Sequence, residues 1–353
     1  MIRVAFVRGK YLNNFEGQNY CFQGSNIKLT AISSLFPLHE KFPFPVIRLP
    51  YLTDLEHFKV PSKLIKVIAN RTLGDSQILI GLEKLSNKFD IFHTADPHYY
   101  YSYQLAKMRV KGLIKRLIVT SWETIPFNNE TVYRKKYIKK FTQKSADLFI
   151  CYTEEAKRCL TKEDVDVNKV KVVRLGVDLN RFKSKKIRSK KAITILFVGR
   201  LVEEKGITDL KKAFATVRRT YSNVELKIVS DVSYEKMSTI YQSADMLVVP
   251  SKTTRTWEEQ YGMVLVEAMA SGLPIIAYNS GAIHEVLGNA GILVDEGNIE
   301  GLSSAITRLA TNRNLRIKLG TMGRERAEKY FDSRSTNKKI QKIYEHICGD
   351  IDK

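Results

Sequence analysis

The chain has 353 residues, 44% of them hydrophobic and 10% aromatic, which is enough for two domains with real cores and excludes a wholly disordered protein. No run reaches about 18 consecutive apolar residues, so no membrane-spanning helix is predicted. The net charge of +21 is uneven, because residues 1–200 carry 37 Lys and Arg against 17 Asp and Glu, and residues 201–353 carry 21 against 20. Such a field attracts nucleic acid, anionic lipid or phosphorylated substrate.

The first half alternates short β-branched or apolar runs with longer amphipathic ones. Strands are predicted at 2–7, 90–95, 116–122, 146–153 and 169–176. Helical periodicity lies between them, at 62–73, 99–109, 130–144 and 154–161. This alternation predicts βαβ units and a mostly parallel sheet covered on both faces.

A basic segment, "RFKSKKIRSKK" (181–191), separates the halves, and the same alternation then resumes. Strands are predicted at 192–200, 226–231, 246–251, 274–278 and 291–294. Helices are predicted at 206–219, 233–243, 262–271, 300–310, 313–330 and 335–349. The pattern predicts an α/β protein in which two Rossmann-like domains face each other across a cleft. We expect a first domain at 1–182 joined by the helix 335–349, a linker at 183–191 and a second domain at 192–331.

Two carboxylates eight positions apart stand in a segment that otherwise reads as core, "EEQYGMVLVEAMASGLP" (258–274). Glu259 lies in a loop after a predicted strand, and Glu267 lies inside the helix that begins near Gly262. Free amides and the positive dipole end at a helix N-terminus suit a phosphate, and buried carboxylates accept hydrogen bonds from sugar hydroxyls. The alternative is that both are ordinary solvated helix-end carboxylates.

A second group of charges follows the first strand of the second half, in "FVGRLVEEKG" (197–206). Arg200 and Lys205 flank a turn at the carboxyl end of that strand, where parallel sheets bind ligands. Fixed cations there suit a diphosphate and would stabilise its charge as it departs. The alternative is two cations on a surface turn of a basic chain.

These stretches, in this order and spacing, resemble glycosyltransferase family 4. The motifs that carry the resemblance are "FVGRLVEEKG", "YQSADMLVVPS", "EQYGMVLVEAMASGLPIIAYNSGAIHEVL" and "GILVDEGN", with weaker agreement at "DIFHTADP", "ADLFICYTEEAKRCL" and "RLGVDLNRF". That family has the two-domain GT-B fold and a signature of two Glu residues separated by seven others, which Glu259 and Glu267 match. The resemblance covers nearly the whole chain.

The resemblance implies a retaining glycosyltransferase that takes a nucleotide-diphosphate sugar in its second domain and an acceptor, such as a glycan or lipid-linked sugar, in its first. No cofactor and no metal are expected. Catalytic roles would fall to Arg200, Lys205, Glu259 and His93. Substrate-binding roles would fall to Glu267, Gly262, Met263 and Gly17, with Glu267 on ribose and Gly17 near the donor.

Two departures from the family pattern stand out. Many members have a second His two residues after the first, but here the sequence is His93-Thr94-Ala95. His93 is either a cleft residue or a satisfied core histidine, and His98 is a further candidate. The family's second domain also usually has one more β-α unit between the motifs "SNVELKIVSD" and "YEKMSTIYQSAD" than this chain has room for.

Other readings follow from the remaining signals. The "DVD" at 164–166 resembles a metal-binding motif but is rejected because three residues match readily by chance. The basic stretch 129–144 is either a helix with a solvated basic face or a surface for anionic lipid.

A start without a signal peptide and four scattered Cys residues predict a cytoplasmic protein, possibly peripheral on the membrane. The rival functions are a GT-B epimerase or phosphorylase and a basic nucleic-acid- or membrane-binding protein, although no nucleic-acid partner is expected.

Overall fold

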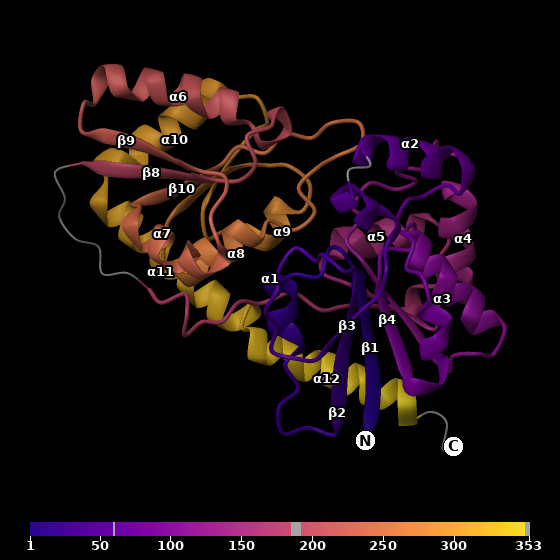
Figure 1. Cartoon of the computed structure of the whole chain (residues 1–353). Helices are drawn as coiled ribbons and strands as arrows, with labels where there is room; N and C mark the ends of the chain where they lie inside the picture. The colour runs from indigo at the N-terminus through magenta and orange to yellow at the C-terminus, as the bar shows by residue number, and fades with distance from the viewer. Residues whose placement is uncertain (59–60, 185–191, 350–353) are drawn as a thin grey trace. The chain divides into compact units, whose positions relative to one another are not determined.

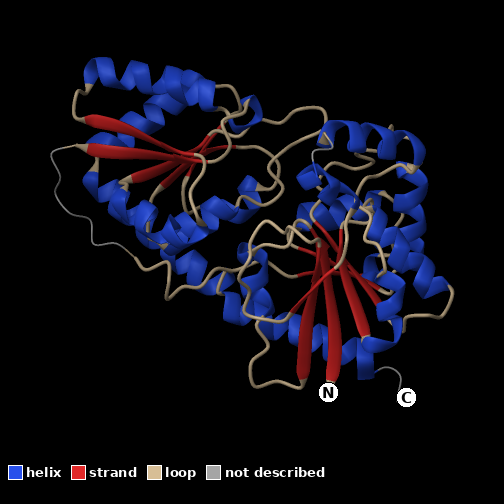
Figure 2. Cartoon of the chain, in the orientation of Figure 1, coloured by secondary structure: helices blue, strands red, loops and turns tan. Residues whose placement is uncertain are grey.

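The computed structural model describes residues 1–58, 61–184 and 192–349, which form two α/β units (Figure 1). The first unit comprises Met1–Arg174 and Thr336–Lys353, and the second comprises Leu175–Ser335. In each unit the strands form a central sheet with helices on both sides (Figure 2). The prediction of two α/β units with parallel sheets is confirmed.

The boundary between the units lies earlier than the expected residue 182. Residues 175–182 pack with the second unit, because Val177 pairs with Asp332 and the buried Phe182 ring lies 6.1 Å from that of Tyr241. Most of the expected linker, residues 185–191, falls outside the described residues.

The first unit contains a seven-stranded parallel sheet in the order β3-β2-β1-β4-β5-β6-β7. Its strands are β1 (Ile2–Gly9), β2 (Ile27–Ser33), β3 (Val46–Arg48), β4 (Ile91–Ala95), β5 (Leu117–Ser121), β6 (Leu148–Cys151) and β7 (Val170–Val172). Its helices are α1 (Asn14–Gly17), α2 (Ser62–Thr72), α3 (Tyr100–Val110), α4 (Lys135–Ser145), α5 (Glu154–Lys162) and α12 (Ser333–Gly349), which belongs to this unit from Thr336. The central strands β4 and β5 are buried along their whole length because both faces of the sheet are covered.

Sequence patterns missed two strands and misplaced one helix start. β3 has only three residues at the sheet edge, and β2 precedes a loop rather than a helix, so the βαβ alternation is absent there. The helix expected from 130 begins at Lys135, because Arg134 adopts a left-handed φ of 57° that ends the preceding turn.

The second unit contains a five-stranded parallel sheet in the order β12-β11-β10-β8-β9. Its strands are β8 (Ile193–Val198), β9 (Val224–Val229), β10 (Met246–Val249), β11 (Ile275–Tyr278) and β12 (Ile292–Val294). Its helices are α6 (Ile207–Thr220), α7 (Met237–Ser243), α8 (Met263–Ala270), α9 (Ile283–Leu287), α10 (Ile299–Thr311) and α11 (Arg313–Tyr330). The chain runs from the edge strand β9 through one short 3-10 turn into α7, so no β-α unit stands between them.

A fully buried ion pair organises the first unit. Arg8, at the end of β1, donates to both carboxylate oxygens of Glu16 at 2.9–3.1 Å and to the Thr120 hydroxyl at 3.1 Å. The Tyr152 hydroxyl donates to Glu16 at 2.6 Å and lies 3.0 Å from the Tyr20 hydroxyl. Each charge therefore has several partners, as burial requires.

No helix among the described residues is both long and apolar enough to cross a bilayer.

Candidate functional site

The carboxyl ends of β8 and β10 meet in the second unit through a close backbone approach at Gly206. Gly206 has a left-handed φ of 67°, and a Cβ there would lie 1.8 Å from the Pro250 carbonyl oxygen. Only glycine satisfies both demands. The turn after β8 is thereby held against the loop after β10, which carries Ser251 and Glu259.

This packing places an ion pair at the sheet edge. The Lys205 ammonium donates to Glu259 Oε2 at 2.6 Å, and the Ser251 hydroxyl donates to the same oxygen at 2.9 Å. Lys205 Nζ also lies 4.7 Å from the centre of the Trp257 ring. The Lys205 and Glu259 side chains are 20% and 12% exposed, so both remain accessible to a ligand.

The backbone of Glu259 is fixed from the loop after β11. The Ala282 amide donates to the Glu259 carbonyl at 2.8 Å, and a Cβ at Gly281, whose φ is 50°, would lie 2.4 Å from that carbonyl oxygen. Glu259 therefore occupies a defined position at the edge of the sheet. Three loops, after β8, β10 and β11, converge on it.

The N-terminus of α8 lies three residues further along the chain. Gly262 caps the helix with a left-handed φ of 77°, and its carbonyl accepts from the Leu265 amide at 2.8 Å. Within the described residues, the amides of Met263 and Val264 have no protein acceptor. These amides and the positive end of the helix dipole are available to an anion.

Glu267 is buried in α8 rather than solvated. Its carboxylate accepts a hydrogen bond of 2.7 Å from the Tyr241 hydroxyl of α7. Burial raises the pKa of the Glu267 carboxyl to about 7, although the Tyr241 hydroxyl and the Arg181 charge oppose the shift. Arg181 stacks on the Tyr234 ring at 4.1 Å from its centre.

Four neighbours of Lys205 and the two carboxylates had no role in the sequence prediction: Trp257 beside Lys205, Ser251 beside Glu259, and Tyr241 and Arg181 beside Glu267. Tyr241 and Arg181 do lie inside "YQSADMLVVPS" and "RLGVDLNRF", two of the stretches that carry the family resemblance. Nothing in their spacing indicates that they approach Glu267, because only the fold joins residues 26 and 86 positions apart in the chain.

Arg200 differs from Lys205. Its side chain is 64% exposed, and its ion-pair partner among the described residues is Glu204, at 3.5 Å. The structure therefore brings Lys205, Glu259 and the start of α8 together, and it leaves Arg200 as an exposed cation on the same turn.

The structure favours the core reading of His93 over the catalytic one. His93 is fully buried in β4, with Nδ1 2.6 Å from the Tyr344 hydroxyl of α12 and Nε2 2.7 Å from the Thr120 hydroxyl. Burial and the Arg8 charge hold its pKa well below the usual range, so the ring is neutral. Both nitrogens are occupied, which leaves none for a substrate.

The other first-unit candidates lie elsewhere. Gly17 ends the short helix α1, and a Cβ there would lie 3.3 Å from the Phe44 ring. His98 is half-buried beside Tyr99, and burial together with Lys135 and Lys139 lowers its pKa well below the usual range.

The carboxyl end of β4 carries a polar group that the sequence prediction passed over. Asp96 follows the strand with a left-handed φ of 47°, is 7% exposed, and accepts from the Trp122 amide at 3.0 Å. Burial raises its pKa to about 7. Nearby, the rings of Tyr11 and Tyr99 stack at 5.6 Å, and the buried Tyr101 hydroxyl has no partner among the described residues. A strained carboxyl among phenols is suited to binding hydroxyl groups.

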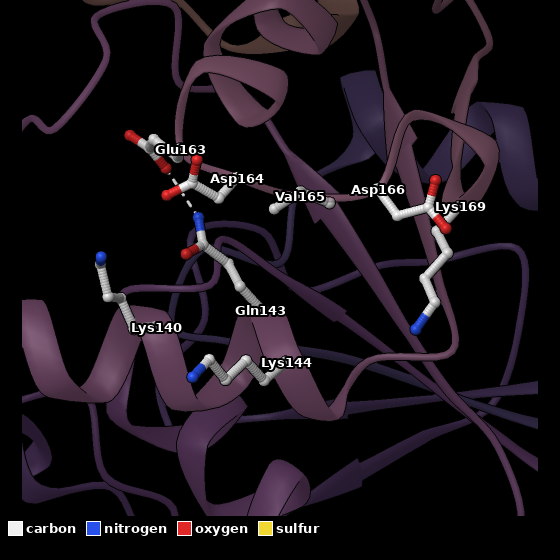
Figure 3. A pocket seen from close by; sticks show the side chains of 8 residues that line it. All are labelled: Lys140, Gln143, Lys144, Glu163, Asp164, Val165, Asp166 and Lys169. Atoms are coloured by element: carbon white, nitrogen blue, oxygen red, sulfur yellow. Dashed lines mark hydrogen bonds between the residues drawn. The ribbon is translucent and has the colours of Figure 1, made fainter.

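A pocket of about 340 Å³ in the first unit contains none of the predicted site residues (Figure 3). Gln143 donates to Glu163 at 2.6 Å on one side, and lysines and carboxylates share the walls. Its lining includes Asp164 and Asp166 of the rejected "DVD" motif; the full set is Lys140, Gln143, Lys144, Glu163, Asp164, Val165, Asp166 and Lys169. Charges of both signs give this pocket no preference for one class of ion.

Comparison with known proteins assigns the family. The model of glycosyl transferases group 1 matches residues 179–237 and 223–326, and that of Glycosyltransferase Family 4 matches residues 71–181. A curated relative, the sulfoquinovosyl transferase of Arabidopsis thaliana, is 24% identical over 298 residues, covering 72% of this chain and 56% of the relative. The chain spans about half the length of the curated relatives that it matches first.

Solved structures share the fold. Sucrose-phosphate synthase from Thermosynechococcus elongatus superposes with a TM-score of 0.73 at 15% identity, covering 99% of this chain and 100% of that one. Anabaena HepE in complex with UDP-glucose superposes with a TM-score of 0.67 at 14% identity, covering 98% and 100%. The two family models together reach from residue 71 to 326, and they show that the chain belongs to glycosyltransferase family 4. The solved structures show that it has the GT-B fold.

Proposed function

We propose that this protein is a retaining glycosyltransferase that uses a nucleotide-diphosphate sugar as donor. The observation that carries the proposal is the Lys205 ammonium, held at the carboxyl edge of a parallel sheet by Glu259, which itself precedes the free amides of α8 closely in the chain. A cation and helix amides at such an edge suit a diphosphate. Membership of the family and the likeness to a fold solved with UDP-glucose support it.

Each part of the donor would have its own binding group in the second unit. Lys205, with Arg200 on the same turn, would bind the diphosphate, and the amides of Met263 and Val264 would bind one of its phosphates. Glu259 would hold hydroxyls of the donor sugar. Glu267 is buried and already accepts a hydrogen bond from the Tyr241 hydroxyl, and it would accept further hydrogen bonds from the ribose diol.

Charge stabilisation, rather than covalent catalysis, is the role proposed for these residues. When the bond from sugar to phosphate breaks, negative charge grows on the departing diphosphate, and Lys205 is already in place to stabilise it. That phosphate would take the acceptor proton on the face from which it leaves, and retention of configuration follows. The transfer as proposed needs no protein nucleophile and no metal.

The acceptor would bind the first unit at the carboxyl end of β4. Asp96 would accept a hydrogen bond from an acceptor hydroxyl, and the stacked Tyr11 and Tyr99 rings would pack against the sugar or lipid-linked group. Asp96→Asn should raise the KM for acceptor about tenfold and leave donor binding unchanged. An unchanged acceptor KM would remove Asp96 from the site.

A panel of UDP, GDP and ADP sugars tests the function directly. A ligand that binds the native state raises its melting temperature by mass action, so the nucleotide that shifts the transition is the base of the donor. Product analysis with that donor and glycan or lipid-linked acceptors should then show transfer with the anomeric configuration kept.

Two results would contradict the proposal. Conversion of the sugar nucleotide without an acceptor would indicate an epimerase, and phosphate-dependent release of sugar 1-phosphate would indicate a phosphorylase. No shift with any nucleotide sugar, combined with steep salt-dependent binding to nucleic acid, would indicate a binding protein instead.

A further inference from the structure

Helix α2 (Ser62–Thr72) exposes an apolar stripe that its packing does not use. Leu64, Val67 and Ile68 are 52%, 46% and 53% exposed, while Ile65 and Ala69 on another side are buried against the first unit. Positions 64, 67 and 68 share one side of a helix because they are three and four residues apart. The helix therefore has two apolar sides, and only one of them contacts its own unit.

Positive charge surrounds this stripe. Lys63, Lys66 and Arg71 are exposed, and no carboxylate of the described residues lies within ion-pair distance of them. Between Glu56 and Asp75 the sequence has four basic residues and no acidic one. Burial lowers the pKa of Lys10, and the nearby positive charge of Lys66 lowers it further. The surface is cationic as well as apolar.

The first unit as a whole carries the same sign. It has 33 Lys and Arg against 19 Asp and Glu, a net charge of +14. Helix α4, which the sequence suggested as the basic face, contributes less than expected, because Lys135 and Lys139 turn inward. Lys135 pairs with Asp75 at 2.8 Å, and Lys139 pairs with Glu163.

Exposed tyrosines also lie at the start of α4 and in the segment before it, which contacts the end of α2. A Cβ at Gly74 would lie 2.6 Å from the Tyr133 carbonyl oxygen, so the segment after α2 contacts the segment before α4. Tyr133 and Tyr137 are more than half exposed. Tyrosine is favoured where apolar and aqueous surroundings meet.

We infer that α2 docks the first unit on an anionic lipid bilayer, with Leu64, Val67 and Ile68 among the acyl chains and Lys63, Lys66 and Arg71 at the headgroups. A helix of this kind lies in the plane of the interface. The charges favour a membrane over a second copy of the chain, because a symmetric dimer through α2 would bring its cations against their own equivalents. Three aliphatic side chains are also a small fraction of the roughly 800 Å² per partner that a stable interface buries.

Flotation with vesicles tests the inference on the full chain. The protein should float with vesicles of phosphatidylglycerol and phosphatidylcholine at low salt, bind pure phosphatidylcholine at least tenfold more weakly, and dissociate as salt is raised. Leu64→Glu/Ile68→Glu should reduce binding at least tenfold, and Lys63→Glu/Lys66→Glu should do the same. Val110→Glu, at a 65% exposed aliphatic position of α3, is the matched control and should bind like the native protein.

Three outcomes would overturn it. The native protein could fail to bind anionic vesicles, the α2 variants could bind as well as the control, or the native protein could be a dimer that Leu64→Glu/Ile68→Glu makes monomeric in light scattering. The melting shift with nucleotide sugar is measured on the same variants. Because α2 belongs to the first unit, that shift should survive, so failure of membrane docking is distinguishable from failure of the proposed function.

Discussion

Each unit has an ion pair near the carboxyl end of its first strand, and the two pairs differ in what surrounds them. In the first unit, Arg8 and Glu16 are 1% and 3% exposed, and Tyr152 and Thr120 take up further hydrogen bonds. In the second, Lys205 and Glu259 remain partly exposed, and within the described residues Lys205 donates one hydrogen bond, to Glu259.

The difference separates a structural pair from a site. A guanidinium whose donors are all directed at protein acceptors has nothing to offer a ligand, whereas an ammonium has three donors and here uses one. The residue types reinforce this contrast, because Arg forms a rigid fork suited to fixed partners and Lys can redirect its donors. Position at the end of a strand is therefore not enough to identify a binding residue; unused hydrogen-bonding capacity at that position is the better guide.

The largest expected effect comes from breaking the buried pair. Arg8→Met leaves the Glu16 charge buried with one hydroxyl donor, and should lower the free energy of unfolding by about 3–5 kcal/mol. Urea unfolding can follow the first unit alone in a Trp257→Phe background, because Trp122 is then the remaining tryptophan. Arg8→Met/Glu16→Leu, which removes both charges, should recover most of the loss, and a loss below about 1 kcal/mol in Arg8→Met would contradict this account.

Breaking the second pair should change activity instead of stability. Lys205→Ala should reduce transfer on the order of 10²–10³-fold, as loss of a group that stabilises transition-state charge does, with little change in melting temperature. Lys227→Ala is the matched control, because Lys227 is an exposed lysine of the same unit bonded to Ser243 at 3.0 Å. Equal turnover in the two variants would remove Lys205 from the site.

The titration of Glu267 should make the stability and donor binding of the protein depend on pH. Its pKa is raised to about 7 by burial, so the neutral form is favoured in the folded state, and the ligand-free protein should lose stability as pH rises from about 4.5 to 7. Donor binding should tighten over the upper part of that window, because the carboxylate is the better acceptor for ribose hydroxyls. Glu267→Gln should reduce the loss of stability over this window, to which the raised pKa of Asp96 also contributes, and should weaken donor binding about tenfold and remove its pH dependence. Calorimetry at several pH values measures both quantities.

The smallest effect is expected at Arg200. An exposed cation whose one ion-pair partner in the described part of the chain lies at 3.5 Å contributes little on its own, so Arg200→Ala should raise the donor KM only about two- to fivefold. A loss as large as that of Lys205→Ala would mean that Arg200 moves onto the diphosphate when donor binds, and the two cations would then be equivalent.

Sequence patterns predicted most of the fold because a parallel sheet covered on both faces leaves long apolar runs between amphipathic helices. The five strands of the second unit were all predicted. The strands β2 and β3 were not, since β2 is followed by a loop, and β3 is a three-residue edge strand followed by a 3-10 helix (Leu52–Phe58) rather than an α-helix. Edge strands are short and need no apolar pattern on both faces.

The candidate site was predicted less completely, for a different reason. Motif spacing indicates which side chains lie at a strand end, as it did for Lys205 and Glu259, but it does not reveal partners 54 positions apart. His93 illustrates the limit. Its hydrogen-bond partners Thr120 and Tyr344 are 27 and 251 residues away, so the stretch "DIFHTADP" could not reveal that both of its ring nitrogens are occupied.

That last contact has a consequence for how the protein is made. The first unit acquires Tyr344 from α12, which follows the whole of the second unit in the chain. During synthesis the second unit therefore has all of its residues before the first one does, although the first begins to emerge earlier. Until α12 has left the ribosome, His93 lacks one of its two partners, so the first unit completes its core only after the second unit has been made.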